Sequence, residues 1–280
     1  MASLAQWLAL PVALLLPAVA HPESPASGGG VDTEHIFGFT EGADIGEKGE
    51  IELESGFIGR FGKAGSFAAV QNETAVRYGI ADSIRLAVGT LFDYRSIYGV
   101  PDLDDYSAFN FAGLTAEARW QVLRRDSSPI GLTLSATPSW RRVDDTSAQP
   151  VDSYSVVLTL LADAALIPDT TFAAVNLTGT PTSTRAAGVW QQETPLEASA
   201  AVAHAVAPGV FLGGEVRHLT HNREGFFTGH ALFIGPSLFV KMSETIALKA
   251  AWSAQIPDEG RLDLVNFERH QVRALFVKTF

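Results

Sequence analysis

The chain has 280 residues, of which 46% are hydrophobic and only 18% are charged, and its formal net charge is −11. Surfaces that bind nucleic acid are basic, so this acidic chain is not expected to have a nucleic-acid partner. The chain has no cysteine, which excludes a disulfide scaffold and thiolate metal sites. Beyond the extreme N-terminus, no run reaches the roughly 18 to 20 apolar residues that a membrane-spanning helix needs.

Residues 1–20, MASLAQWLALPVALLLPAVA, are typical of a secretory signal peptide. An apolar centre runs from Leu8 to Leu16, and Ala18-Val19-Ala20 has the small-x-small pattern of a cleavage site. The stretch lacks Lys and Arg, and a transmembrane anchor is the alternative. Its short length and its two prolines favour removal after Ala20.

Residues 21–48 form a second region with a different composition. The stretch 21–35, HPESPASGGGVDTEH, is rich in Pro, Ser and Gly and predicts a flexible linker. The apolar piece that follows, HIFGFTEGADIGEKG, is acidic and interrupted by glycine. A small extra strand, a periplasmic cap and a segment inside a lumen all fit this pattern. We therefore expect 21–48 to be a flexible N-terminal segment that lies in the periplasm or plugs a barrel.

Residues 49–280 alternate apolar and polar side chains with a period of two, which predicts β-strands. Turn residues divide this region into twelve strands. The expected strands are about 49–61, 65–78, 83–97, 106–122, 129–142, 151–163, 170–180, 193–206, 209–220, 228–242, 245–256 and 266–280.

The connections between these strands alternate in length. One set is tight, near 79–82, 124–127, 167–169, 207–209 and 243–244; the other, except for 62–64, is longer and more polar, at 98–105, 143–150, 181–192, 221–227 and 257–265. Outer-membrane barrels have short periplasmic turns, long outer loops and an even number of strands. The sequence therefore predicts an all-β fold, a closed antiparallel up-and-down transmembrane barrel over 49–280.

The two faces of the strands support this fold. In 83–97, Leu86 and Val88 share one face while Arg85, Asp93 and Arg95 share the other. Aromatic residues gather near strand ends, as in the girdles at membrane interfaces. A soluble secreted β-sandwich also alternates, and it remains the rival fold. In 65–78, Asn72 and Thr74 fall on the expected lipid side, and 170–180 fits poorly as well, so we expect a bulge or a register error in one of these strands.

Charged residues on the inward faces suggest a ladder of ion pairs. Glu50, Glu52 and Glu54 share one face of the first strand, and like charges in a row are costly unless they are hydrated or paired. We expect these acids to meet arginines across the closing seam and from neighbouring strands; a hydrated acidic face without partners is the alternative. The predicted ladder is Glu50, Glu52, Glu54, Glu73, Arg77, Arg85, Asp93, Arg95, Glu117, Arg119, Arg141, Glu215, Arg217, Lys249, Arg269 and Arg273.

A lumen with both signs of charge allows two functions. The first is a passive channel or uptake path for small solutes. The second is a non-transporting structural, adhesive or ligand-binding barrel, blocked by ion pairs and by 36–48. An outer-membrane hydrolase ranks third, because GxSxG and HExxH motifs are absent. His218, His221 and His230 flank one loop, where histidines are more often surface residues, so we expect no catalytic residue, metal site or cofactor.

The last strand, NFERHQVRALFVKTF, places Val272, Ala274, Phe276, Lys278 and Phe280 on one face. It resembles the closing strand of bacterial outer-membrane β-barrels. That resemblance implies that Phe276 and Phe280 form the assembly signal, with the outer-membrane assembly machinery and outer-membrane lipid as partners, in a Gram-negative bacterium.

A looser resemblance is carried by GEIELESGFIGRF and by the strand-turn-strand unit YGIADSIRLAVG. These stretches look like the transporter barrels associated with aromatic-compound (phenol) degradation. The resemblance implies passage of small-molecule solutes and names no substrate.

Overall fold

The computed structural model of the chain describes residues 31–280; the predicted signal peptide (1–20) and residues 21–30 of the predicted linker lie outside the described part. No helix of residues 31–280 is long and apolar enough to cross a membrane. The strands are β1 (Ile51–Phe61), β2 (Ser66–Ala81), β3 (Ile84–Tyr98), β4 (Tyr106–Leu123), β5 (Gly131–Val143), β6 (Pro150–Ile167), β7 (Thr171–Gly179), β8 (Thr182–Ala186), β9 (Val189–Glu193), β10 (Leu196–Ala207), β11 (Val210–Arg223), β12 (Phe226–Lys241), β13 (Ile246–Ile256) and β14 (His270–Thr279).

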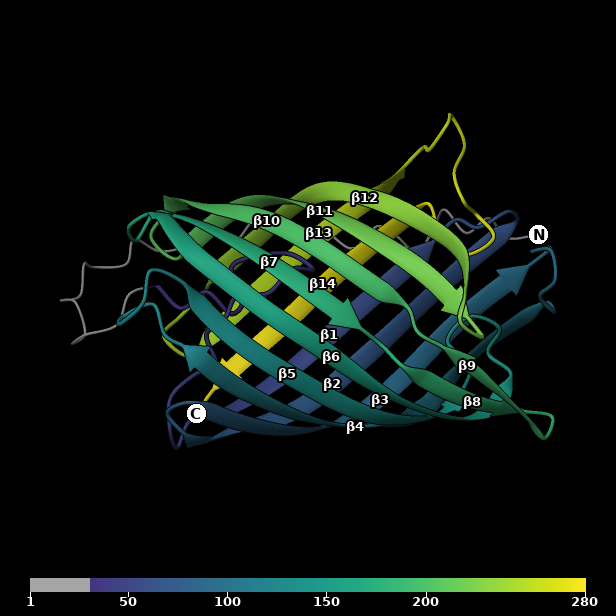
Figure 1. Cartoon of the computed structure of the whole chain (residues 1–280), viewed down its shortest axis with the longest axis horizontal. Coiled ribbons are helices and arrows are strands. Elements are labelled where there is room, and N and C mark those ends of the chain that lie inside the picture. The colour runs from purple at the N-terminus through teal and green to yellow at the C-terminus, as the bar shows by residue number, and fades with distance from the viewer. Residues whose placement is uncertain (1–30) are drawn as a thin grey trace.

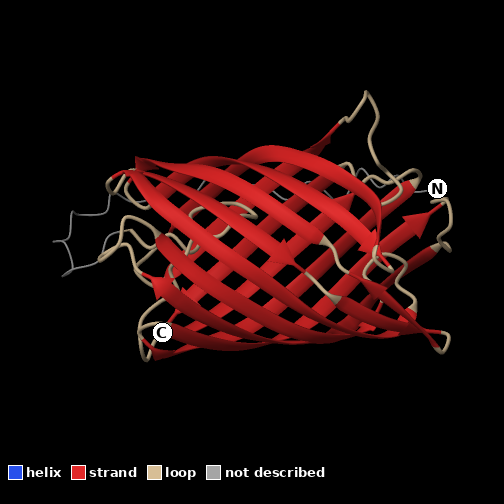
Figure 2. Cartoon of the chain, viewed as in Figure 1, coloured by secondary structure: helices blue, strands red, loops and turns tan. Residues whose placement is uncertain are grey.

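Backbone pairing closes the sheet on itself. β1 pairs antiparallel with β2 and with β14, and β10 pairs with both β7 and β11. Twelve strands therefore make a closed antiparallel barrel (Figures 1 and 2), which confirms the predicted fold. β8 and β9 form an additional hairpin that pairs with β6 and, through one residue pair, with β11.

The connections differ from the prediction in three places. The connection between β4 and β5, expected to be tight, covers residues 124–130 and is as long as the loop 99–105 at the opposite end. Residues 181–192, expected as a loop, contain the β8–β9 hairpin. Residues 221–227, also expected as a loop, mostly continue the strands, because β11 and β12 meet at a two-residue turn. Glu224 and Gly225 both have positive φ, 50° and 79°, the backbone that tight hairpin turns require. We call the end with Asp82-Ser83 and Pro208-Gly209 the short-turn end and the opposite end the loop end.

Side chains alternate across the wall. On β3, Leu86 and Val88 are exposed outward, whereas Arg85 is buried inside. A surface of outward apolar residues with charges enclosed is the reverse of a soluble protein. In lipid, only helices and closed barrels satisfy all backbone hydrogen bonds. The architecture therefore places the protein in the bacterial outer membrane.

The irregularity expected in the second and seventh strands is absent from their central parts. β2 pairs with β3 in unbroken register from Ser66 to Gly79, and β7 pairs with β10 without a shift. The polar residues on the lipid side of β2 bond to one another and to β1: Asn72 Nδ2 donates to Ser55 Oγ (3.1 Å), and Thr74 Oγ1 lies 3.1 Å from the same oxygen. A register shift does occur in β2, but at its end, between Gly79 and Ala81, whereas the polar residues in the centre of the strand satisfy their polar groups locally.

Candidate functional site in the barrel lumen

Residues 31–48, which we call the lumen segment, lie inside the barrel at the short-turn end. Figure 1 shows their purple trace within the outline of the strands, toward the end that carries the C-terminus. Residues 33–38 are buried, and the backbone amides of Phe39 and Thr40 donate to the Glu215 carboxylate of β11 (2.8 and 2.9 Å). The sequence allowed an extra strand, a periplasmic cap or a segment inside the lumen, and residues 31–48 lie inside the lumen.

The lumen segment folds back on itself. The amide of Gly42 donates to the Glu34 carbonyl (3.4 Å), and the amide of Thr33 donates to Asp44 Oδ2 (2.9 Å). A Cβ at position 42 would overlap the Thr33 carbonyl, so glycine permits this close approach. The fold directs Phe39, Thr40 and the following Glu41 deeper into the lumen.

An apolar contact holds the near side of the segment. Ile36 and Phe37, both almost fully buried, belong to a cluster with Phe172 of β7, Ala203 of β10 and Phe211 of β11. Burying such a side chain contributes roughly 1.5–3 kcal/mol. Ile36 and Phe37 make this contact only while the segment is docked inside the barrel, so their burial favours the docked position.

Glu34 is the centre of the ion pairs that fasten the segment. Its Oε1 lies 2.7 Å from Arg77 Nη1, 2.5 Å from Arg85 Nη2 and 3.0 Å from Arg119 Nη1. Burial alone would raise the pKa of Glu34, but Arg85 and the other neighbouring cations outweigh it and hold the pKa well below its usual range. Glu34 is therefore ionised while it is docked.

Glu41 forms a second group of ion pairs nearer the middle of the barrel. It binds Arg119 Nη2 at 2.6 Å and Arg273 Nη2 at 2.5 Å, and Arg273 Nη1 also donates to the Phe39 carbonyl (3.1 Å). Burial opposes ionisation, but Arg119 and Arg273 lower the pKa of Glu41 well below its ordinary value. Arg119 thus bridges both acids of the segment.

A third group lies at the short-turn end. Arg125, in the turn between β4 and β5, donates to Asp44 of the segment and to Asp163 of β6 (Nη1 to Oδ2, 2.6 Å). Asp163 also accepts from the Ala43 amide (2.8 Å) and from the Thr33 hydroxyl. The segment is therefore attached to the barrel wall at three places, through Glu34, through Glu41 and through Ala43-Asp44.

The ladder was expected to bring Arg77, Arg85 and Arg119 to the acids of β1. Among the described residues only Arg77 reaches one of these acids, and Arg85 and Arg119 bind Glu34 and Glu117 instead. Arg77 Nη2 lies 2.6 Å from Glu54 Oε2, and Arg119 Nε lies 3.0 Å from Glu117 Oε2. The seam register, however, places Glu54 opposite Val277 and Arg273 opposite Ile58, so Arg273 binds Glu41 instead of the acids of β1.

Several ladder residues have no salt bridge in the described part of the chain. Arg269 lies before β14 and is exposed, so it does not join the inward set. Glu50 also lacks a salt bridge, and Glu52 has only His35, at 3.7 Å. Lys249 is buried, and its amine has no hydrogen-bond partner. The acidic row of β1 is thus only partly paired.

Other ladder residues form a separate cluster at the loop end. Asp93 lies 3.1 Å from Arg95 and 2.5 Å from Arg141. Two loop residues join this cluster. The Asp145 carbonyl accepts from Arg95 Nε (3.1 Å), and the Asp145 carboxylate lies 3.5 Å from Arg60 Nη1, which in turn lies 3.6 Å from Glu268 Oε1. The loops that contain Asp145 and Glu268 therefore fold toward the lumen.

A polar cavity of about 310 Å³ lies inside the barrel beside the ion pairs of Glu41. Its floor is the tip of the lumen segment, Phe39 and Glu41, and its walls carry Glu73, Glu117 and Arg217 among other polar residues. The Arg217 guanidinium stacks on the Phe39 ring at 4.0 Å and binds Glu197 (2.8 Å). Glu73 accepts from the Thr115 hydroxyl (2.6 Å). The cavity thus has both signs of charge.

Sequence reasoning did not single out several residues of these clusters. Asp163, Glu197 and Arg60 stand on the inward face of their strands, so the period-two pattern could have identified them. Glu34, His35, Glu41 and Asp44 follow no such period, because the segment has no regular backbone. They had no signal beyond being acidic or imidazole groups near a short apolar stretch.

The three outer histidines lie at the loop end, on β11 and β12. His221 Nδ1 lies 3.1 Å from Thr228 Oγ1, and its Nε2 lies 3.7 Å from Glu193, an order that resembles a triad. The Thr228 hydroxyl, however, donates to the His221 carbonyl (2.9 Å), so its proton is not directed at the imidazole. His218 and His230 are exposed and contact each other at 3.3 Å.

Comparisons with known proteins agree with the barrel. None of the curated proteins compared with the chain matches it. The structure is similar to the COG4313 outer membrane channel from Pseudomonas putida F1, with a TM-score of 0.58 and 15% identity over 85% of this chain and 98% of that chain. Lower scores relate it to the KdgM porin (0.47, 10% identity, 82% and 99%) and to the translocator domain of autotransporter NalP from Neisseria meningitidis (0.49, 9%, 85% and 91%).

At these identities the structural likeness shows the fold alone. The sequence itself matches the profile of a protein family over residues 30–280, which includes the lumen segment and all strands. The chain therefore belongs to the family described as "Family of unknown function (DUF6662)".

Proposed function

We propose that this protein is a passive outer-membrane channel for small solutes and that the lumen segment is its plug. The observation that carries the proposal is the attachment of residues 33–44 to the inner wall solely by non-covalent contacts. A segment held in this way can leave the lumen without breaking the barrel.

The charges support a polar path. When the segment leaves, Arg77, Arg85, Arg119 and Arg273 lose the carboxylates of Glu34 and Glu41 and face the lumen. Rings of charged side chains select solutes in membrane pores. Glu73 and Glu117 line the same cavity, so the opened path has both signs of charge and suits small polar or zwitterionic solutes.

The solute class rests on two resemblances. The similar structure from Pseudomonas putida F1 is an outer membrane channel, and the stretches at the start of the barrel resemble transporters associated with phenol degradation. A small aromatic acid is therefore the first solute to test. The rival is a non-transporting barrel that binds ligands or partners through its loops, and we do not propose an enzyme.

Conductance in a planar lipid bilayer tests the channel. The mature protein and a variant lacking residues 31–47 are compared after heat-modifiable migration on gels shows that both are folded. We expect small, infrequent openings for the mature protein and a steady, larger current for the deletion variant. Absence of current from both folded proteins contradicts the channel and favours the rival.

We also propose that residues 1–20 are removed during export in a Gram-negative bacterium. N-terminal sequencing of the protein from outer membranes should begin at His21. A mature protein that begins at Met1 contradicts this proposal.

A further inference from the structure

His35 of the lumen segment lies among carboxylates from two parts of the chain. Its Nε2 is 3.2 Å from Glu54 Oε1, 3.7 Å from Glu52 Oε1 and 3.9 Å from Glu34 Oε2. Glu52 and Glu54 belong to β1, and all four side chains are more than nine-tenths buried. The imidazole therefore joins the segment to the barrel wall at a point where three acids converge.

These groups lack the partners that buried polar atoms normally have. Within residues 31–280, neither ring nitrogen of His35 has a hydrogen-bond partner, and neither has Glu52 Oε1 or Glu54 Oε1. Leaving a buried polar group unsatisfied costs about 1–3 kcal/mol. Four such atoms in one place require partners from outside the chain, either water molecules or an ion.

The spacing fits a divalent transition metal. In a tetrahedral site with metal–ligand bonds of about 2.0–2.1 Å, neighbouring ligand atoms lie about 3.3–3.4 Å apart. His35 Nε2 and Glu54 Oε1 are 3.2 Å apart, and Glu52 Oε1 lies 3.7 Å from the same nitrogen, so the Glu52 side chain has to move to complete the site. One imidazole nitrogen with two carboxylate oxygens suits Zn²⁺, whereas Ca²⁺ prefers six to eight oxygens.

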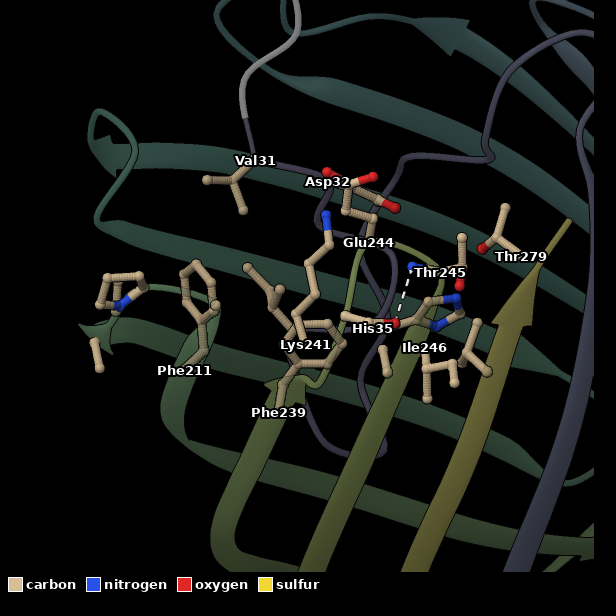
Figure 3. Close-up of a pocket in the computed structure, with 18 of the residues that line it drawn as sticks. Val31, Asp32, His35, Phe211, Phe239, Lys241, Glu244, Thr245, Ile246 and Thr279 are labelled. Atoms are coloured by element: carbon tan, nitrogen blue, oxygen red, sulfur yellow. Dashed lines mark hydrogen bonds between the residues drawn. The ribbon is translucent and has the colours of Figure 1, made fainter. Parts of the chain in front are cut away.

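We propose that His35, Glu52 and Glu54 bind a divalent transition cation of the zinc class, which fastens the lumen segment to β1. An ion can reach the site from the short-turn end, where a cavity of about 900 Å³ is lined by His35, Glu52 and Glu50. Figure 3 shows His35 on one side of this cavity, near Ile246 and Thr279, with Asp32 and Lys241 also bordering it.

The surrounding charges leave these three ligands available. Arg77 holds the second oxygen of Glu54 (2.6 Å), and arginines hold both oxygens of Glu34, so Glu34 is a neighbouring charge and not a ligand. Three nearby cations disfavour a bound metal ion: the guanidinium groups of Arg77 and Arg85 and the buried amine of Lys249. The carboxylates of Glu34 and Glu50 oppose them.

The metal site itself does not depend on the proposed channel function. Its consequence does, since a metal that binds the segment and the wall together would hold the channel closed. The test therefore measures binding, not current. Untagged mature protein in detergent is titrated calorimetrically with ZnCl₂ and, separately, with CaCl₂. All variants carry His218→Ala and His230→Ala, which remove the exposed histidine pair at the loop end, where His230 lies 3.4 Å from Asp258.

We expect binding of one Zn²⁺ per chain in this background. Either His35→Ala or Glu54→Gln should lower the affinity for Zn²⁺ at least about tenfold. Glu54→Gln keeps a group that can accept from Arg77, so it controls for loss of docking in His35→Ala. Unchanged Zn²⁺ affinity in both folded variants, no Zn²⁺ binding at all, or Ca²⁺ bound as tightly as Zn²⁺ overturns the proposal. None of these results depends on whether the barrel conducts.

Discussion

Replacing Glu34 by Gln should release the lumen segment from the barrel. The change keeps the shape of the side chain and removes the charge that faces Arg77, Arg85 and Arg119. Arg77 retains Glu54, and Arg119 retains Glu41 and Glu117. Arg85 retains only Glu117, at 3.6 Å.

The magnitude follows from this imbalance. Removing one partner of a buried ion pair costs ~3–5 kcal/mol. Because two of the three arginines keep other carboxylates, we take the lower end, ~3 kcal/mol, for the docking equilibrium. Each 1.4 kcal/mol is a factor of ten, so the undocked fraction should rise about 100-fold.

A single cysteine measures this fraction. The natural chain has no cysteine, and Thr40 is fully buried in the docked segment with a hydroxyl that has no hydrogen-bond partner. Thr40→Cys should therefore react with a maleimide only after undocking. We expect labelling to be about 100-fold faster in the Glu34→Gln background than in Thr40→Cys alone.

The control is Glu268→Gln, which changes an equally buried carboxylate at the loop end, paired with Arg60 and Lys63. It should leave the labelling rate of Thr40→Cys unchanged. Equal labelling rates with and without Glu34→Gln, in folded barrels, would refute the view that Glu34 holds the segment.

Three further changes test other contacts. Arg273→Glu should place two like charges together at Glu41 and weaken docking, so the folded protein with Thr40→Cys should react faster with maleimide than Thr40→Cys alone. An unchanged rate contradicts the Glu41 contact. Gly42→Val should overlap the Thr33 carbonyl and raise the labelling rate without lowering barrel yield, measured on heat-modifiability gels; slow labelling in the folded variant argues against the turn. Phe280→Ala should lower the yield of folded barrel in membranes several-fold if the terminal aromatic is the assembly signal, whereas a normal yield rejects that role.

The barrel could be predicted because its wall repeats one rule. Leu86 and Arg85 point to opposite sides by strand geometry alone, so alternation identifies strands, faces and inward charges. The register of the seam depends on turn geometry around the whole barrel, which is why Arg273 was assigned to the wrong acids.

The lumen segment could not be predicted in the same way. Glu34 and Glu41 have partners far away in sequence, and their backbone has no period that a pattern can reveal. Their positions depend on which inward arginines the closed barrel brings together. The β11–β12 turn was missed for a related reason, since polar residues near Glu224 continue the strands to a two-residue turn.

Disulfide formation between the segment and the wall tests the lumen position most directly. A Cβ built at Gly131 of β5 would lie 3.0 Å from the Ala43 Cβ, and disulfides need about 3.5–4.5 Å, so the two positions must separate slightly. The same Cβ would overlap Asp163 Oδ1, so the Asp163 carboxylate must also move. The pair Ala43→Cys and Gly131→Cys should oxidise in intact outer membranes and yield a linked peptide by mass spectrometry. Ala43→Cys with Ala69→Cys, at the loop end, should not. A missing link in the first pair, or equal linking in both, contradicts a segment docked inside the barrel.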